Sequence, residues 1–258
     1  MNPPTEQYPS SSLQIQSSFD QPAWQGPEKS IVTDPAGMKA LLRQTDRPLW
    51  LVSDGKTTGL TAHPSQTDNG QAASPRYHVL AALPAVPVRA LGNPAFIERY
   101  GLSAAYYGGA MANAISSEQM VIALGQIGLM GSYGAAGMIP ARLESAICNI
   151  QQTLGDRPYA FNLINSPNEP ALEARSADLY VRHGVRVVEA SAYLDMTFPL
   201  VYYRAAGLSQ TPDGQIVVGH RVIAKLSRKE VARRFMDPAP EDILTQLVSE
   251  GRISEEQA

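Results

Sequence analysis

Two glycine-rich segments, each predicted to follow a β-strand, constrain the fold of this chain more than any other feature. Both lie within residues 104–137, which read AAYYGGAMANAISSEQMVIALGQIGLMGSYGAAG. Glycine has no Cβ, so a turn of this kind lets backbone N–H groups come close to a bound group. In a β/α barrel the functional loops follow the carboxyl ends of the parallel strands. The stretch therefore predicts strand–turn–helix units with a site at that edge of the sheet.

The same alternation of short strands and helices continues to about residue 235. The predicted strands cover 106–109, 129–133, 159–163, 185–189 and 221–226, and the predicted helices cover 117–126, 140–154, 169–183, 197–206 and 228–235. Such alternation favours right-handed crossovers and a parallel sheet. Because a closed barrel has eight strands, we predict an α/β fold containing about the first five strands of a (β/α)8 TIM barrel.

Four segments are predicted along the chain. Residues 1–29 are rich in Pro, Ser and Gln and are predicted to be a disordered leader. Residues 30–95 are predicted to form a small α+β N-terminal module, and 96–235 the barrel part. Residues 236–258 are predicted to be helical, and Ser254 starts a further helix that has no body behind it. We therefore expect a fragment or one part of a split barrel.

The elements of the N-terminal module are less regular. An Asp-Pro start and apolar spacing predict a short helix over 32–44. Apolar runs predict strands over 48–55 and 77–86, with a polar loop between them.

Composition excludes several classes of protein. The net charge of −3 carries no basic footprint for nucleic acid. No apolar run approaches the roughly 20 residues that a membrane helix needs, and the first residues do not resemble a secretory signal. The single cysteine, Cys148, excludes an internal disulfide, and its place inside a helix predicts a buried thiol. Together these features favour a cytoplasmic protein.

The side chains offer few independent catalytic candidates. No pair of the four histidines has metal-ligand spacing, so we expect no metal site. Ser191 has no base beside it in the sequence. The segment 131–137 lacks both a Walker lysine and a Rossmann pattern. The basic run 227–234 is interpreted as a solvated helix face or as a dock for an acidic carrier-protein helix or for phosphopantetheine.

An ordered set of short motifs resembles one enzyme family. The motifs are GGAMA, GSYGAAG, PYAFNLINSP, LYVRHGVRVVEASAYLD, YRAAGL, HRVIAKLSR and FMDPAP, all within residues 104–258. They resemble the PfaD-type enoyl reductases of polyunsaturated fatty acid and polyketide synthases, within the nitronate monooxygenase (2-nitropropane dioxygenase) superfamily. The resemblance implies a TIM barrel, bound FMN, NADPH or NADH as hydride donor, and reduction of an enoyl thioester on an acyl carrier protein. It also implies that residues 236–258 start a helical insertion.

The resemblance implies roles for individual residues. Gly109, Ala110 and Met111 would form the loop against the flavin ring. Asn162 would bind the pyrimidine edge of the flavin, or else cap its own loop. Lys225 would stabilise negative charge on the reduced ring, or else pair with Glu189. Glu189 would bind substrate, order Lys225 or pair with Arg186.

Two departures from the family limit the assignment. Asn113 stands where we expect a small glycine, and the Gly-Gly-His motif with the expected proton-donating histidine is absent. We therefore assign no catalytic residue in this chain, and activity would depend on a missing half-barrel, a second chain or a homodimer. A nitronate monooxygenase on the same scaffold and a non-catalytic subunit of a split barrel are the alternatives.

Overall fold

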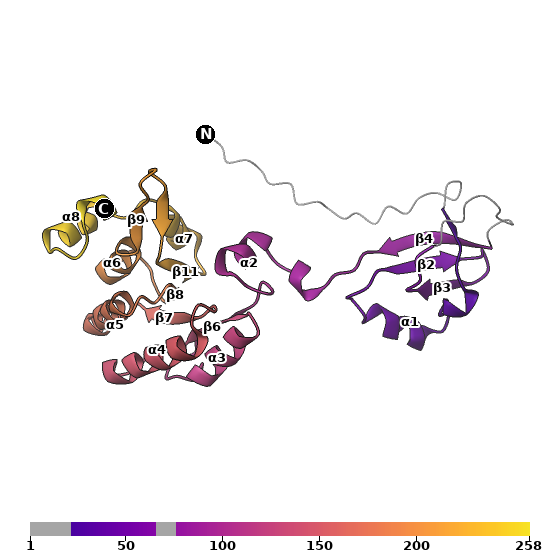
Figure 1. The fold of residues 1–258 in the computed structure, drawn as a ribbon, viewed down its shortest axis with the longest axis horizontal. Coiled ribbons are helices and arrows are strands. Elements are labelled where there is room, and N and C mark those ends of the chain that lie inside the picture. The colour runs from indigo at the N-terminus through magenta and orange to yellow at the C-terminus, as the bar shows by residue number, and fades with distance from the viewer. Residues whose placement is uncertain (1–21, 66–75) are drawn as a thin grey trace. The chain divides into compact units, whose positions relative to one another are not determined.

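The computed structural model describes residues 22–65 and 76–258. The chain divides into two compact units, residues 1–91 and 92–258, and each has its own sheet (Figure 1).

The first unit is a four-stranded antiparallel sheet with one α-helix. Its strands are β1 (Ala23–Trp24), β2 (Leu49–Ser53), β3 (Thr58–Thr61) and β4 (Tyr77–Leu83), in the order β1-β4-β2-β3. The helix α1 (Pro35–Leu42) begins after Asp34, whose side chain accepts the Gly37 N–H at 2.7 Å. Short 3-10 turns cover Glu28–Ser30 and Val88–Ala90. The fold agrees with a small α+β module, with β3 inside the segment predicted to be a loop.

This unit begins earlier than the sequence predicted. Trp24 falls within the predicted leader, yet it pairs with Tyr77 in the sheet and is only 3% exposed. Its indole N–H donates to the His63 carbonyl at 3.1 Å, and its ring packs edge-on against Tyr77. The buried Trp24 side chain, with the strand pairing of Ala23 and Trp24, thus joins this segment to the sheet. The predicted leader before residue 22 lies outside the described residues.

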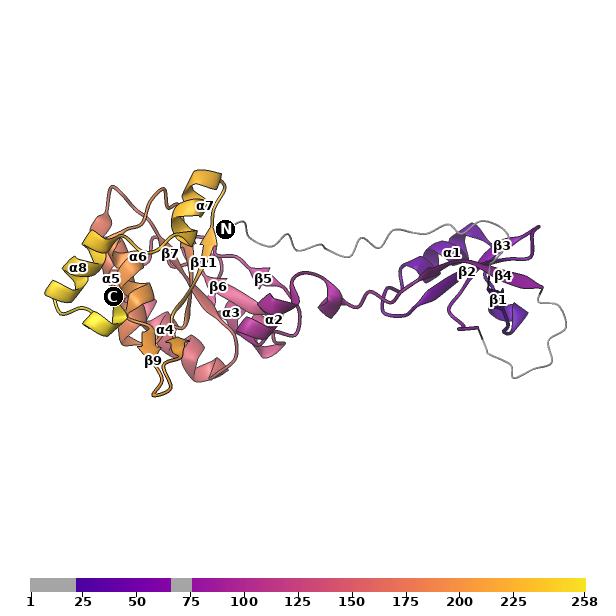
Figure 2. The ribbon, with the colours of Figure 1, turned by 90° about the horizontal axis from the view of Figure 1, so that it is seen from above.

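The second unit is built on five parallel strands. They are β5 (Tyr107–Gly108), β6 (Met130–Tyr133), β7 (Ala160–Ile164), β8 (Val187–Ser191) and β11 (Arg221–Lys225), in the order β11-β8-β7-β6-β5. The helices α3 (Glu118–Gln126), α4 (Pro140–Leu154), α5 (Pro170–Arg182) and α6 (Phe198–Ala205) lie along the outside of the curved sheet (Figures 1 and 2). This arrangement confirms the predicted α/β fold with about five strands of a barrel.

The remaining elements of this unit are shorter. Between α6 and β11 lies a hairpin of β9 (Leu208–Gln210) and β10 (Ile216–Val218), whose connection contains a Pro-Asp-Gly turn. After β11 come α7 (Lys229–Met236), α8 (Glu241–Ser249) and a 3-10 turn, Glu255–Gln257. The last turn has Ser254 at its N-cap, as predicted. The sequence did not predict α2 (Pro94–Tyr100), which begins after the capping side chain of Asn93.

The main core lies between the sheet and its outer helices. Large buried side chains from the strands, among them Tyr133 and Phe161, meet buried side chains from the inward faces of the helices, among them Tyr180 and Tyr203. In α4, burial repeats at Leu143, Ile147, Ile150 and Leu154. Cys148 lies off this stripe and is exposed, so the prediction of a buried thiol is wrong.

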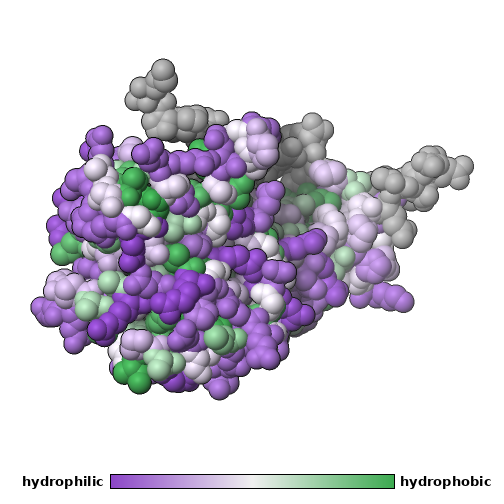
Figure 3. Space-filling model, turned by 60° about the vertical axis from the view of Figure 1, so that its left-hand side comes forward, coloured by the Kyte–Doolittle hydropathy of each residue, from purple (hydrophilic) through white to green (hydrophobic). Residues whose placement is uncertain are grey.

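The face of the molecule in Figure 3 is mostly hydrophilic, with hydrophobic side chains in separate patches. Within the described residues, no helix combines the length and apolar character needed to cross a bilayer.

Candidate functional site

The inner, concave face of the parallel sheet carries two layers of side chains. Side chains alternate between faces along a strand, so residues two apart share a face. The first layer is apolar and is formed by Met130, Ala160, Val187 and Ile223, against which α2 packs Phe96, Ile97 and Tyr100. The next layer, two residues further along each strand, is polar and is formed by Ser132, Asn162, Glu189 and Lys225. A polar layer at the carboxyl half of parallel strands is the expected place for a site.

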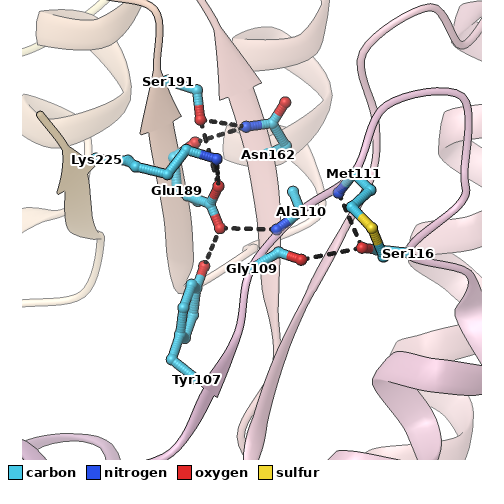
Figure 4. Close-up of polar contacts among 9 residues, drawn as sticks. All are labelled: Tyr107, Gly109, Ala110, Met111, Ser116, Asn162, Glu189, Ser191 and Lys225. Carbon is cyan, nitrogen blue, oxygen red and sulfur yellow. Dashed lines mark hydrogen bonds and ion pairs between the residues drawn. The ribbon is translucent and has the colours of Figure 1, made fainter. Parts of the chain in front are cut away.

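Glu189 is the centre of the polar layer. Its side chain is fully buried, and its Oε2 accepts the Tyr107 hydroxyl at 2.8 Å and the Ala110 N–H at 3.0 Å. Its Oε1 accepts the Lys225 ammonium at 2.7 Å and the Ser191 hydroxyl at 3.3 Å (Figure 4). The carboxylate thus joins β5, the loop after it, β8 and β11 in one network.

The network keeps Glu189 ionised. Burial alone would raise the pKa of this carboxyl group. The hydrogen bonds from Lys225, Ala110 and Tyr107 outweigh burial and hold the pKa below its ordinary value. Among the three roles predicted for Glu189, the geometry corresponds to the ordering of Lys225, because Arg186 instead reaches Asp156 at 3.3 Å. The Lys225 side chain remains 58% exposed, and its ammonium group has N–H donors that Glu189 does not use.

Tyr107 was not predicted as a site residue. Burial, and then the neighbouring Glu189 carboxylate, raise the pKa of the Tyr107 phenol well above its ordinary value, so the group donates rather than ionises. Ser191, two residues after Glu189 on β8, was considered in the sequence only as a nucleophile. Strand periodicity puts Ser191 on the same face as Glu189, and this signal could have identified it as a partner.

Asn162 connects β7 to β8. Its Nδ2 donates to the Glu189 carbonyl at 3.1 Å and to the Ser191 hydroxyl at 2.9 Å. Its backbone carbonyl accepts the Tyr180 hydroxyl at 2.6 Å. Within the part of the chain that the structure describes, no donor reaches its Oδ1. The side chain is therefore held in place by its donors and retains an acceptor for a ligand.

The first glycine-rich loop borders this layer. The Ser116 hydroxyl accepts the Met111 N–H at 2.8 Å and donates to the Gly109 carbonyl at 3.0 Å. A Cβ added at Gly109 would meet only Glu189 Oε2, at 3.7 Å, so space beside this backbone is open. Met111 is 49% exposed and lies on the side of the loop away from Glu189 (Figure 4). The structure therefore brings together all the predicted site residues except the Met111 side chain.

The second glycine-rich loop supports the first. The N–H groups of Asn113 and Ala114 donate to the carbonyls of Ala136 and Gly134, at 2.8 and 2.9 Å. Asn113 and Ala114 have φ angles of 55° and 53°, in the left-handed region. Asparagine tolerates this region better than most residues, which explains how Asn113 can stand where a glycine was expected. A Cβ at Gly134 would lie 1.7 Å from the Met111 carbonyl oxygen, so only glycine permits the contact.

The site can bind the polar edge of a planar ligand. An acceptor (Asn162 Oδ1), a cation (Lys225) and open loop backbone (Gly109) are offered on one face. A metal is a poorer fit, because the single carboxylate of the layer is already satisfied by four donors.

The first unit of the chain matches a known protein family. Residues 24–85 match the family described as "Fatty acid synthase subunit PfaD N-terminal domain". This match in the first unit, with the partial barrel in the second, makes the chain similar to a portion of a PfaD-type enoyl reductase, as predicted.

Individual relatives are similar over different lengths. One subunit of the polyunsaturated fatty acid synthase of Thraustochytrium sp. is 41% identical over 238 residues, which is 92% of this chain and 15% of the relative. "Polyketide biosynthesis protein PksE" of Bacillus subtilis is 36% identical over 204 residues, 79% of this chain and 25% of the relative.

A solved structure is similar as well. The enoyl reductase domain of MlnA, from the macrolactin biosynthesis cluster of Bacillus amyloliquefaciens, matches with a TM-score of 0.63 and 42% identity. The match covers 66% of this chain and 39% of that one. The chain therefore spans less than half the length of each of these relatives.

Proposed function

We propose that this chain forms the flavin-contacting part of an FMN-dependent enoyl reductase that acts on acyl-carrier-bound enoyl thioesters in polyunsaturated fatty acid or polyketide biosynthesis. The observation that carries the proposal is the convergence of Gly109, Asn162, Glu189 and Lys225 in one layer beside an open loop. The similarity to a synthase subunit, to a polyketide biosynthesis protein and to an enoyl reductase domain supports the choice of reaction.

The residues present fit a flavin. The ring has a polar edge with alternating donors and acceptors, and the free Oδ1 of Asn162 can accept from it. Backbone of the loop at Gly109 and Ala110 is open to a flat group, whereas Met111 would contact the ring only after its side chain turns. When bound, FMN would supply hydride transfer from NADPH or NADH to the β-carbon of the enoyl thioester.

The chain's own residues would set the charge beside the ring. Glu189 holds the Lys225 ammonium at 2.7 Å, and Tyr107 and Ala110 hold Glu189 in turn. A positioned cation stabilises negative charge that develops on a neighbouring group without further reorganisation. Glu189 is therefore a positioning residue for Lys225 rather than a base. We assign no proton donor within this chain.

We further propose a cytoplasmic location and a synthase acyl carrier protein as the partner that presents the substrate. The single cysteine, which can form no disulfide within the chain, supports the location. The similarity to a synthase subunit supports the partner.

The test is a titration of the purified chain with FMN, in which binding is measured by the quenching of flavin fluorescence. We expect saturable binding that weakens about tenfold in Lys225→Met and Asn162→Ala, each removing one proposed contact. Lys229→Met, an exposed lysine on α7, serves as the matched control and leaves affinity unchanged. The proposal is contradicted if the flavin fluorescence is not quenched, or if all three variants lose FMN affinity equally.

Activity is measured separately. Anaerobic oxidation of NADPH or NADH in the presence of crotonyl thioester supports enoyl reduction. Oxygen uptake with an alkyl nitronate instead assigns the scaffold to nitronate oxidation.

A further inference from the structure

A cavity lies at the opposite end of the parallel sheet from the candidate site. It has a volume of about 180 Å³ and lies among residues at the amino ends of β6, β7, β8 and β11 and at the end of α2. Its lining includes Arg99, Arg157, Arg186 and Arg221, together with Tyr100 and Asp156. Four arginines therefore converge on a small space that contains one acidic side chain.

These arginines are poorly neutralised. Arg186 reaches Asp156 at 3.3 Å, and Arg157 donates to the Gln126 carbonyl at a long 3.4 Å. Within the described ranges, the side chains of Arg99 and Arg221 have no acidic partner and no hydrogen-bond acceptor. Like charges gathered in this way repel one another, and an anion placed among them would relieve the repulsion.

A further arginine adds to the positive field. Arg204, on α6, donates to the His220 carbonyl at 2.8 Å and is half-buried. Burial, with the charge of Arg221 adding to it, lowers the pKa of the Arg204 guanidinium. Arg221 therefore contributes positive charge toward both Arg204 and the cavity.

The cavity is separate from the candidate flavin site. Arg221 and Lys225 are the first and last residues of β11, so they lie about 13 Å apart at the usual rise per strand residue. The apolar layer of Met130, Ala160, Val187 and Ile223 lies between the two. A ligand at the arginines would thus bind independently of the proposed redox function.

We propose that this arginine cavity binds a phosphate group, either as inorganic phosphate or as a phosphate monoester. Planar guanidinium groups donate in pairs to phosphate oxygens, which makes arginine the preferred side chain for such groups. The volume is below the range of pockets that hold whole cofactors, so a single small anionic group fits better than a dinucleotide.

The test is isothermal titration calorimetry of the chain with inorganic phosphate and, separately, glycerol 3-phosphate, at ionic strength held constant with sodium chloride. We expect saturable binding of at least one ligand. Arg99→Gln should weaken it about fivefold and Arg99→Gln with Arg221→Gln at least tenfold. Arg99 is exposed, so its single variant should keep the fold, which circular dichroism checks.

The matched control is Arg175→Gln, an exposed arginine on α5 without an acidic partner among the described residues. It should bind as the unaltered chain does. Tighter binding of glycerol 3-phosphate identifies an ester as the occupant, and equal or weaker binding identifies inorganic phosphate. No binding of either ligand, or binding that Arg99→Gln and the double variant leave unchanged, overturns the proposal.

Discussion

Glu189 shows how a fully buried carboxylate can remain charged in this fold. It accepts two side-chain hydroxyls, one backbone N–H and one ammonium group. An unpaired charge in such a place would be costly, and removing one partner generally costs more than the intact pair contributes. The residues of the network come from distant parts of the chain, so each supports the placement of the others.

The depressed pKa of Glu189 makes stability depend on pH in one direction. Its folded pKa lies below its ordinary value of 4.5, so the unfolded state binds the proton more readily. The stabilising contribution of ionised Glu189 to the folded state is therefore present above pH 4.5 and is lost as the pH falls through the folded pKa. We expect Glu189→Gln to be less stable than the unaltered chain at pH 7, by a margin that narrows below pH 4.5.

Urea unfolding followed by circular dichroism at several pH values measures this margin. Glu169→Gln, at the exposed start of α5, is the control and should show no such narrowing. A difference between Glu189→Gln and the unaltered chain that stays constant from pH 7 to pH 3 would contradict the assignment of an ionised, stabilising carboxylate.

At the scale of elements, the two glycine-rich loops have different roles. Gly109 lies beside open space next to Glu189, whereas Gly134 lets the backbone of the first loop pass within contact distance. Hydrogen bonds between the two loops, from the Asn113 N–H to the Ala136 carbonyl and from the Ala114 N–H to the Gly134 carbonyl, hold them together. One glycine therefore serves the proposed ligand, and the other serves the packing of the loop that would hold it.

This difference predicts different effects on stability for two similar substitutions. In Gly134→Ala the new Cβ would meet the Met111 carbonyl at 1.7 Å, so the loop must move, at a cost of roughly 1–3 kcal/mol in the free energy of unfolding. In Gly109→Ala the nearest atom would be 3.7 Å away, so stability should change by less than about 0.5 kcal/mol. FMN affinity should nevertheless fall in Gly109→Ala, because the Cβ occupies the open face.

Urea unfolding and flavin quenching, applied to both variants, make the comparison. Equal destabilisation by the two substitutions would refute the distinction between the loops. Unchanged flavin affinity in Gly109→Ala would refute the place of the ring beside Gly109 but leave the packing argument intact.

At the scale of the molecule, the chain consists of two units with separate cores. Both tryptophans, Trp24 and Trp50, lie in the antiparallel sheet of the first unit. Seven of the eight described α-helices lie in the second. Tryptophan fluorescence therefore reports on one unit, and helical circular dichroism reports mainly on the other.

This distribution predicts that the two signals will follow different urea transitions. Separate cores need not unfold together, and two-state behaviour is expected for each unit rather than for the chain. Fluorescence and ellipticity at 222 nm, recorded on the same samples, test the prediction. Coincident midpoints and slopes would show instead that the units unfold as one.

Local physical chemistry made much of the fold predictable. Ser117 caps α3 through the Met120 N–H, and Pro140 starts α4 where a missing N–H costs nothing, so both helix starts follow from neighbouring residues. The predicted strands end close to Asn162 and at Glu189, but β7 and β8 continue two residues beyond them, so of Asn162, Glu189 and Lys225 only Lys225 ends its strand. The sequence did not predict the short elements β1, β3 and α2, because they depend on partners far along the chain or on a single capping side chain.

The sequence by itself determined the alternation of strands and helices and the glycine turns, because these depend on contacts within a few residues. Only the tertiary structure decided that Glu189 pairs with Lys225 rather than Arg186, that Tyr107 joins them, that Cys148 faces outward and that four arginines meet at one cavity. Tyr107 and Glu189 are 82 residues apart, and their meeting depends on strand order and register, which distant packing settles.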